Sequence, residues 1–265
     1  MPVSLSVVIS YYRSPQNLAV ILEALRCQSE TNFEVWLSED DAHPDTPALV
    51  EKWKKLLPIP FHHLHQQADL GFRKNEMLNR CIMATEAPRM AFLDGDCVPH
   101  RHWVKSYVQT LRSGIFGAGR SVMLGPTISE RLRKDPAQAC NLRWWKLLAS
   151  GSTHIKEGVY LPGMALGPKN RGLVGRNWGA WKNDLIAVNG FDEDYQHAGV
   201  GEDVDVEWRL LSNGCSRLSM KQKALVFHLY HPRTYAEADV QRNYQLMRQK
   251  QEADRVVCLN GIRKE

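Results

Sequence analysis

The sequence lacks the features that mark several common classes of protein. No apolar run reaches the about 18 residues that a membrane-spanning helix needs, and the first strand-like run, residues 5–9, is far shorter. No internal repeat or low-complexity segment is present, so neither a repeat architecture nor a disordered tail is expected. The 265 residues, of which 43% are hydrophobic, predict one soluble domain that is not exported.

Cysteine pairs at the spacing of metal or redox sites are also missing. The six cysteines, at positions 27, 81, 97, 140, 215 and 258, form no Cys-x-x-Cys motif and fall within apolar patterns. This distribution favours reduced, buried thiols over a disulfide framework, and it therefore predicts a reducing, cytoplasmic location.

Neither sign of charge is in large excess. The net charge is +5, the basic residues are spread along the chain, and no zinc-finger, helix-turn-helix or aromatic RNA-binding motif is present, so no nucleic-acid partner is expected. Residues 142–148 mix leucine, tryptophan, lysine and arginine as interfacial helices do, although core packing would use the same composition. The segment leaves peripheral contact with the inner face of the plasma membrane open.

Short apolar runs alternate with amphipathic segments in the first half of the chain, which is typical of β-α-β units. This pattern predicts strands at residues 5–9, 33–37, 59–64 and 90–93, and helices at 14–25, 45–57 and 73–84. The second half predicts a strand at 119–124, a helical stretch at 135–148, a glycine-rich segment at 158–179, a helix at 203–211, a strand at 224–229 and a helix at 236–255. Ligands of such sheets bind at the carboxyl ends of the strands. Ser10, Glu39 with Asp40, and Asp94 with Asp96 all lie at that edge.

Two carboxylates, Asp94 and Asp96, follow the strand at residues 90–93 with only Gly95 between them. Glycine lets the backbone approach a ligand closely, and paired carboxylates suit a divalent cation that bridges a diphosphate. Such a cation would neutralise the charge that develops when a sugar–diphosphate bond breaks. A solvated turn after a strand is the simpler alternative.

Three carboxylates, Glu202, Asp203 and Asp205, crowd the start of the helix expected at residues 203–211. The helix dipole favours ionised acids at this end, so capping alone would explain them. A carboxylate with acidic neighbours can also have the raised pKa that a base needs to take a proton from a sugar hydroxyl. Asp203 and Glu202 are therefore the candidate catalytic residues.

Two histidines, His228 and His231, leave the end of the strand expected at residues 224–229. Imidazole can ligate Mn²⁺ beside carboxylate and phosphate oxygens, although a histidine at a strand end is often structural. Because the pair follows two acidic motifs, His228 is the first candidate metal ligand and His231 the second.

Taken together over roughly residues 4–232, these motifs resemble family 2 glycosyltransferases, and more narrowly a bacterial branch whose second half is related to the galactosyltransferase catalytic segment. The resemblance rests on residues 6–12, 33–41, 71–73, 92–96, 188–195, 201–205 and 228–231. It implies a type A glycosyltransferase fold, an α/β fold with a Rossmann-like mixed sheet flanked by helices. It further implies a catalytic domain at 1–232, with a nucleotide-sugar-binding half at 1–116 and an acceptor-binding half at 117–232, followed by a helical extension at 233–265 packed on the same domain.

The resemblance also assigns roles on the donor side. Ser10 and Glu39 would lie near the nucleotide base, although the family usually has aspartate where this chain has Glu39. The other donor-side residues would be Arg73 and Asn79 near the phosphates and base, Asp94 near the ribose, and Asp96, which with His228 would ligate Mn²⁺ or Mg²⁺.

On the acceptor side, the resemblance implies that Asn177 and Trp178 shape the donor and acceptor pockets. Glu202 would hold the acceptor hydroxyl, and Asp203 would be the general base. Related galactosyltransferases have a tryptophan where this chain has Gly199 or Val200, so stacking on the acceptor is not expected there. Arg176 replaces a residue that is frequently small, and either contact with a charged acceptor or a surface ion pair would explain it.

The function that the resemblance implies is an inverting, metal-dependent transfer of a hexosyl or N-acetylhexosaminyl group. The donor would be a nucleotide sugar, most simply a UDP-sugar, and the acceptor a carbohydrate or lipid-linked glycan in cell-surface polysaccharide or lipopolysaccharide synthesis. A metal-dependent nucleotide-sugar hydrolase would leave the Glu202–Asp203 turn without a role. A catalytically inactive carbohydrate-binding protein would not need Asp94, Asp96, Asp203 and His228 together.

Overall fold

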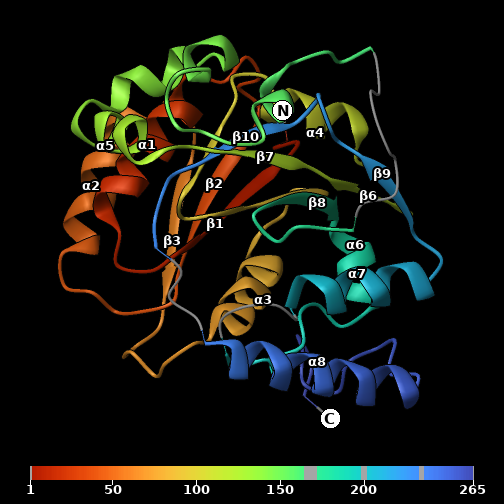
Figure 1. Cartoon of the computed structure of the whole chain (residues 1–265). Helices are drawn as coiled ribbons and strands as arrows, with labels where there is room; N and C mark the ends of the chain where they lie inside the picture. Colours follow the sequence, from red (N-terminus) through yellow and green to blue (C-terminus); the bar gives the residue numbers. More distant parts are fainter. Residues whose placement is uncertain (1, 164–171, 198–201, 233–235, 265) are drawn as a thin grey trace.

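A computed structural model describes residues 2–163, 172–197, 202–232 and 236–264. A seven-stranded mixed sheet forms its centre, with the strands in the order β3-β2-β1-β4-β8-β6-β9 (Figure 1). These strands are β1 (Ser6–Tyr11), β2 (Glu34–Glu39), β3 (Phe61–His65), β4 (Arg89–Asp94), β6 (Ile115–Ala118), β8 (Asn177–Trp181) and β9 (Ser216–Ser219). The sheet confirms the predicted α/β fold, and it contains strands from both expected halves of the catalytic domain.

Helices cover both faces of the sheet because side chains alternate along its strands. In β1, Val7 and Ile9 pack into one core while Val8 packs into the other. The first core receives side chains from α1 (Pro15–Arg26), α2 (Thr46–Leu56), α4 (Trp103–Thr110) and α5 (Pro126–Lys134), and the second from α3 (Lys74–Ala84), α6 (Lys182–Ala187) and α7 (Glu202–Ser212). The C-terminal helix α8 (Glu237–Glu252) lies beyond α7 (Figure 1).

Four neighbouring strands, β3, β2, β1 and β4, run parallel. In this register Ser10 of β1 lies opposite Ser38 of β2 and Asp94 of β4. The polar residues that end these strands therefore meet at one edge of the sheet, as the sequence predicts.

A smaller sheet, ordered β5-β10-β7, continues from this edge. Its strands are β5 (Cys97–Pro99), β7 (Arg120–Met123) and β10 (Leu225–His228). His228 lies opposite Cys97 on one side and Met123 on the other, and the Leu229 N–H donates to the Asp96 carbonyl at 2.8 Å. This pairing brings the end of β10 beside the turn that follows β4.

The helical stretch expected at residues 135–148 does not form one α-helix. The chain instead forms two short 3₁₀ helices, η1 (Pro136–Asn141) and η2 (Trp144–Leu147). Leu142 and Leu147 are buried, whereas Trp145 and Leu148 are exposed, so the apolar side chains are divided between the core and the surface. Among the described residues, no helix combines the length and apolar character needed to cross a bilayer.

The expectation that the cysteines are reduced is wrong for one pair. Cys27, just after α1, and Cys140, in η1, form a disulfide with a Cα–Cα distance of 5.6 Å. The two residues are separated by 113 positions and meet only because η1 packs against α1, which no local spacing could indicate. The other four cysteines are free and buried.

Candidate active site

A cavity of about 520 Å³ opens at the carboxyl edge of the parallel strands. Its lining includes Ser10, Asp40, Lys74, Asp94, Asp96 and His231, which come from four strand ends and from the first turn of α3. The structure therefore brings together three of the predicted donor-side residues: Ser10, Asp94 and Asp96. Carboxylates, a cation and an imidazole around one cavity suit a ligand that carries both phosphates and hydroxyls.

Gly95 allows the turn between the two aspartates to pass close to β1. A Cβ atom at this position would lie 2.7 Å from the Ser10 carbonyl oxygen, which is too close for any other residue type without movement of the backbone. The glycine thus holds Asp94 and Asp96 against the end of β1, where both line the cavity.

At the end of β2, the side chain that reaches the cavity is Asp40 and not the predicted Glu39. Glu39 is 1% exposed and accepts hydrogen bonds from Thr46 Oγ1 at 2.6 Å and His63 Nε2 at 2.7 Å, so its carboxylate is held between β3 and α2. Asp40 accepts the Arg73 backbone N–H at 3.0 Å and Gln66 Nε2 at 2.6 Å. Burial raises the pKa of Asp40 to about 6, and these hydrogen bonds only partly offset that rise.

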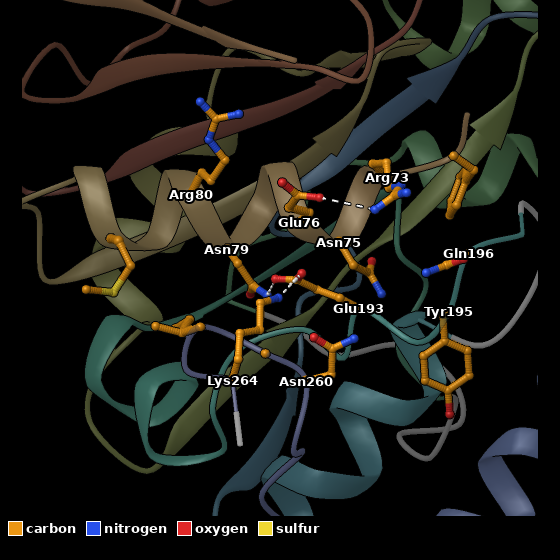
Figure 2. Close-up of a pocket in the computed structure, with 14 residues that line it drawn as sticks. Arg73, Asn75, Glu76, Asn79, Arg80, Glu193, Tyr195, Gln196, Asn260 and Lys264 are labelled. Carbon is orange, nitrogen blue, oxygen red and sulfur yellow. Dashed lines mark hydrogen bonds and ion pairs between the residues drawn. The ribbon is translucent and has the colours of Figure 1, made fainter. Parts of the chain in front are cut away.

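In the segment that opens α3, Lys74 reaches the cavity instead of Arg73. Lys74 Nζ lies 2.9 Å from Asp94 Oδ1, whereas the Arg73 side chain points to Glu76, with 3.7 Å between Nη1 and Oε2. Arg73 and Asn79 line a different cavity, together with Glu193 and Asn260 (Figure 2). Asn79 donates to the Phe191 carbonyl and accepts the Phe191 N–H, both at 2.8 Å, so it ties α3 to the loop before α7.

A cluster of one carboxylate and two imidazoles lies at the carboxyl end of β10. Asp96 Oδ2 is 3.0 Å from His231 Nε2 and 3.4 Å from His228 Nε2, and the potential ligand atoms lie within 4.8 Å of one another. Burial tends to raise the pKa of Asp96, but hydrogen bonds and charge from the two histidines outweigh burial and lower it. Asp96 thus remains ionised, as a metal ligand must.

This donor set fits a divalent cation. His231 Nδ1 lies 2.8 Å from the Pro232 carbonyl, and if it donates there the Nε2 lone pair is left to face Asp96. The mixture of imidazole nitrogen and carboxylate oxygen suits Mn²⁺ better than Mg²⁺, which prefers oxygen ligands. The structure therefore places both histidines beside Asp96, whereas the sequence favoured His228.

Asp203 lies in the first turn of α7, where the helix dipole and a neighbouring amide face its carboxylate. Its Oδ2 accepts the Gly175 backbone N–H at 2.8 Å. Burial raises its pKa; the Gly175 hydrogen bond and the charge of Lys74 act in the opposite direction, and the charge of Asp94 adds to the rise. Asp203 therefore lies within electrostatic reach of two residues that line the cavity.

The side chain of Glu202 and the residues Gly199 and Val200 lie outside the described part of the chain. The role expected for Glu202 is therefore still a prediction.

Asn177 and Trp178 occupy the core of the large sheet. Asn177 is fully buried: Oδ1 accepts from Trp103 Nε1 at 2.8 Å and Tyr107 Oη at 2.9 Å, and Nδ2 donates to two backbone carbonyls. Trp178 is 1% exposed and stacks on Phe92 with ring centroids 4.5 Å apart. These contacts give both residues a structural role in holding β8, the strand that follows Arg176.

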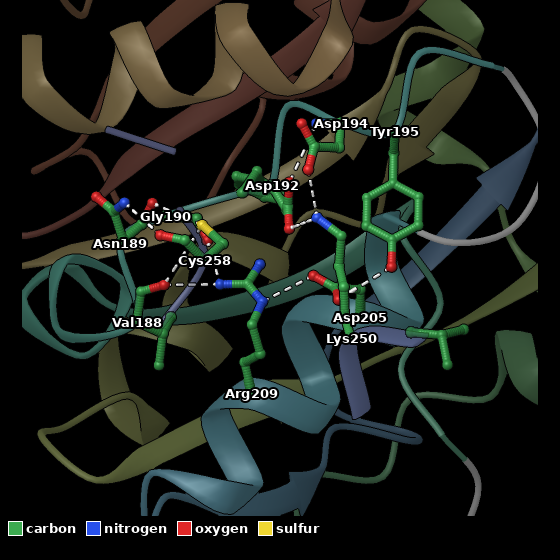
Figure 3. Close-up of polar contacts among 12 residues, drawn as sticks. Val188, Asn189, Gly190, Asp192, Asp194, Tyr195, Asp205, Arg209, Lys250 and Cys258 are labelled. Carbon is green, nitrogen blue, oxygen red and sulfur yellow. Dashed lines mark hydrogen bonds and ion pairs between the residues drawn. The ribbon is translucent and has the colours of Figure 1, made fainter. Parts of the chain in front are cut away.

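A buried polar network anchors α7 to the loop that precedes it (Figure 3). Arg209 donates from Nε to Asp205 Oδ2 at 2.7 Å and from Nη1 to the carbonyls of Val188 and Gly190 at 2.8 and 2.7 Å. Tyr195 Oη donates to the other Asp205 oxygen at 3.1 Å. Asp205 is therefore an anchor of the helix, whereas the Asp203 carboxylate lies outside this network and accepts the Gly175 N–H.

The cavity residues to which the sequence assigned no role are Lys74 and Asp40, although Asp40 was expected at this sheet edge beside Glu39. Each directly follows a residue that it did single out, Glu39 and Arg73. For Asp40, the end of β2 at Glu39 could have indicated the cavity residue. The first side chain beyond a strand can point toward the ligand, whereas the last paired side chain points toward the helices that cover the sheet.

Comparisons with known proteins identify the family of this chain. The family model for glycosyl transferase family 2 matches residues 6–169. The chain is similar to a chondroitin synthase of Escherichia coli, with 26% identity over 260 residues that cover 89% of this chain and 36% of that protein. It is also similar to a chondroitin synthase of Pasteurella multocida (strain Pm70), with 25% identity over 230 residues that cover 80% of this chain and 23% of that protein. The chain thus spans well under two thirds of these relatives.

Solved structures show the same fold. A mannosyltransferase from Pyrobaculum calidifontis in complex with GDP-Man and Mn²⁺ superposes with a TM-score of 0.63 at 14% identity, covering 96% of this chain and 65% of that one. GalNAc-T7 with UDP, GalNAc and Mn²⁺ gives a TM-score of 0.64 at 10% identity, covering 94% and 48%. S. aureus TarS 1–349 in complex with UDP gives 0.60 at 16% identity, covering 92% and 64%. The predicted type A glycosyltransferase fold is therefore confirmed.

Proposed function

Since the chain belongs to glycosyl transferase family 2, we propose that it moves a sugar from a UDP-sugar to a carbohydrate hydroxyl, with inversion and with Mn²⁺ as cofactor. The observation that supports the proposal is that the chain holds both the Asp96–His228–His231 cluster and a half-buried carboxylate of raised pKa, Asp203, which accepts the Gly175 N–H. A hydrolase would need only the cluster. A transferase also needs a base for the acceptor hydroxyl, and Asp203 supplies it.

In the proposed reaction, Asp203 takes the proton of the acceptor hydroxyl as its oxygen bonds to the anomeric carbon of the donor. The bond from that carbon to the diphosphate oxygen breaks on the opposite face, and its electron pair leaves with UDP, so the configuration inverts. Asp96, His228 and His231 would hold the cation, which neutralises the charge on the departing diphosphate when bound. Lys74, at the cavity wall, adds a positive charge near the same group.

On the donor side, we assign the base-recognition role to Asp40 rather than Glu39. A carboxylate at the cavity wall can accept the N3–H of uracil, and Asp40 lines the cavity whereas Glu39 is fully engaged in the core. Ser10 and Asp94, also at the wall, are proposed to contact the nucleoside. The structures that share this fold contain UDP in one case and GDP-Man in another, so the fold does not select the nucleotide. The proposal of UDP therefore depends on the contact between Asp40 and the N3–H of uracil.

The names of the curated relatives, chondroitin synthases and a hyaluronan synthase, support a glycan acceptor in polysaccharide synthesis. A lipid-linked acceptor would place the enzyme at a membrane surface. Trp145 and Leu148 are exposed, and the Arg143 guanidinium lies 5.0 Å from the Trp145 ring, which suits the boundary of an anionic bilayer. Flotation with anionic liposomes tests this contact, and equal flotation of Trp145→Ser would contradict it.

The function is tested by calorimetric titration of UDP and GDP with and without Mn²⁺, followed by a transfer assay over UDP-sugars and glycan acceptors. We expect UDP to bind at least about tenfold more tightly with Mn²⁺, and UDP release to require an acceptor. Rapid hydrolysis of the donor without acceptor would favour the hydrolase. Failure to bind any nucleotide would favour an inactive carbohydrate-binding protein.

A further inference from the structure

A second cavity, of about 470 Å³, lies next to the proposed catalytic groups. Its lining includes Arg120, Ser121, His154, Glu157, Val174 and Arg176. Val174 and Arg176 flank Gly175, whose N–H holds the Asp203 carboxylate. Met123, also in the lining, lies opposite His228 in the pairing of β7 with β10. The cavity is therefore connected through adjacent residues to both the proposed base and the metal cluster.

Arg176 supplies a positive charge to this cavity. Within the described residues no carboxylate forms an ion pair with it, and its Nη1 contacts only Met123 Sδ, at 3.5 Å. Its charge acts on His231, where it opposes the rise in pKa that Asp96 causes. A half-buried guanidinium without an anionic partner is a site for an anionic group of a ligand.

Glu157 supplies an unused hydrogen-bond acceptor to the same cavity. The residue is 4% exposed, and its Oε1 lies 3.6 Å from Lys221 Nζ. Its Oε2 is buried and has no hydrogen-bond partner among the described residues. Buried carboxylate oxygens are almost always satisfied, so an orphaned one in a cavity wall suggests a donor group that arrives with a ligand.

We propose that this cavity binds the acceptor, and that the acceptor sugar carries a carboxylate, as a uronic acid does. The carboxylate pairs with the Arg176 guanidinium, and a sugar hydroxyl donates to Glu157. The proposal rests on the proposed function, because it requires that Asp203 act on a hydroxyl of a sugar bound here. It assigns Arg176 to contact with a charged acceptor, one of the two roles that the sequence left open.

A carboxylate fits the charges of this cavity better than a phosphate does. The planar guanidinium can donate two parallel hydrogen bonds to one carboxylate. A phosphate monoester carries nearly two negative charges at neutral pH, and Glu157 in the same wall would repel it. Arg120 also lines the cavity, but it donates from Nη1 to the Gly119 carbonyl at 2.7 Å, so Arg176 is the main recognition group.

The test measures binding of three matched probes to the protein loaded with UDP and Mn²⁺. The probes are 4-nitrophenyl β-glucuronide, the corresponding β-glucoside and the glucoside 6-phosphate, which differ only at C6. We expect the glucuronide to bind at least about tenfold more tightly than the glucoside, as a charge-assisted hydrogen-bond pair would give. Arg176→Gln should reduce that preference to about twofold, whereas Arg112→Gln, an exposed arginine outside the cavity, should retain it.

The outcomes separate the two proposals. If UDP binds with Mn²⁺ but the glucoside or the 6-phosphate binds as tightly as the glucuronide, the acidic-acceptor proposal is overturned and the proposed function stands. If Arg176→Gln weakens UDP binding and leaves the glucuronide preference unchanged, Arg176 belongs to the donor site and the proposal is again overturned. If wild-type protein binds no nucleotide, both proposals fail.

Discussion

The Gly175 backbone N–H donates a hydrogen bond to Asp203 Oδ2, with 2.8 Å between the nitrogen and the oxygen. The proposed base is therefore held by the segment that immediately precedes β8. A Cβ at Gly175 would lie 3.3 Å from Asp203 Cβ, which leaves little space between the two segments. The position of the base therefore depends on a segment distant in sequence as well as on the start of α7.

Asp203→Asn should keep this hydrogen bond while removing the proton acceptor. We expect the transfer rate to fall by about 10²- to 10⁴-fold, the usual contribution of a general base, with little change in UDP affinity. Steady-state kinetics and calorimetry measure the two quantities. Asp184→Asn is a matched control, because Asp184 also has a pKa raised by burial and accepts a backbone N–H, from Gly114 at 2.8 Å. Near-normal transfer by Asp203→Asn would show that Asp203 is not the base and that the acidic turn only caps the helix.

Replacing His231 or His228 with alanine should weaken Mn²⁺-dependent binding of UDP. Each imidazole faces Asp96 in the cluster, so loss of either removes one ligand, and we expect affinity to fall by about 10- to 100-fold. Asp96→Asn should show a loss at least as large. Calorimetric titration of UDP with and without Mn²⁺ separates metal-dependent from metal-independent binding. His43→Ala, at a site away from the cluster, serves as the control. Unchanged Mn²⁺-dependent binding of UDP by all three cluster variants would contradict the assignment of these residues as metal ligands.

Binding of uridine should strengthen as the pH rises from about 5 to about 7. Burial raises the pKa of Asp40 to about 6, so the group is largely protonated at the lower pH and cannot accept the N3–H of uracil. Uridine lacks the diphosphate, so titration of the metal ligands does not enter the measurement. NMR titration of uridine at several pH values should show this slope for the wild type and none for Asp40→Asn. The same slope in both proteins would assign the pH dependence to another group.

Arg209→Met should destabilise the fold by about 3–5 kcal/mol, because it leaves the buried Asp205 carboxylate without its cation and two carbonyls without a donor. Urea unfolding monitored by circular dichroism gives the free energy. Arg112→Met, at an exposed position, should change it by less than about 0.5 kcal/mol. Adding Asp205→Asn to Arg209→Met should recover part of the loss, since the buried charge is removed. An unchanged unfolding midpoint in the single variant would contradict the anchoring role.

The first half of the fold was readable from sequence because its signals are local. Apolar runs of strand length alternate with helices of 3.6-residue period, so each element from β1 to β4 lies close to its expected residues. The second half was less readable. Strands β5, β6 and β9 have only three or four residues each, and β8 begins in a glycine-rich segment, so none has enough alternation to stand out.

The sequence by itself determined that Ser10, Asp94 and Asp96 meet at one sheet edge, since parallel strands place their carboxyl ends together whatever the loops do. Only the tertiary structure decided that Asp40 and Lys74 reach the cavity while Glu39 and Arg73 do not. It likewise decided that His231 joins Asp96 and that Cys27 meets Cys140. These outcomes depend on side-chain direction at the ends of elements and on contacts across more than a hundred residues, and neither is encoded in the local periodicity from which secondary structure is read.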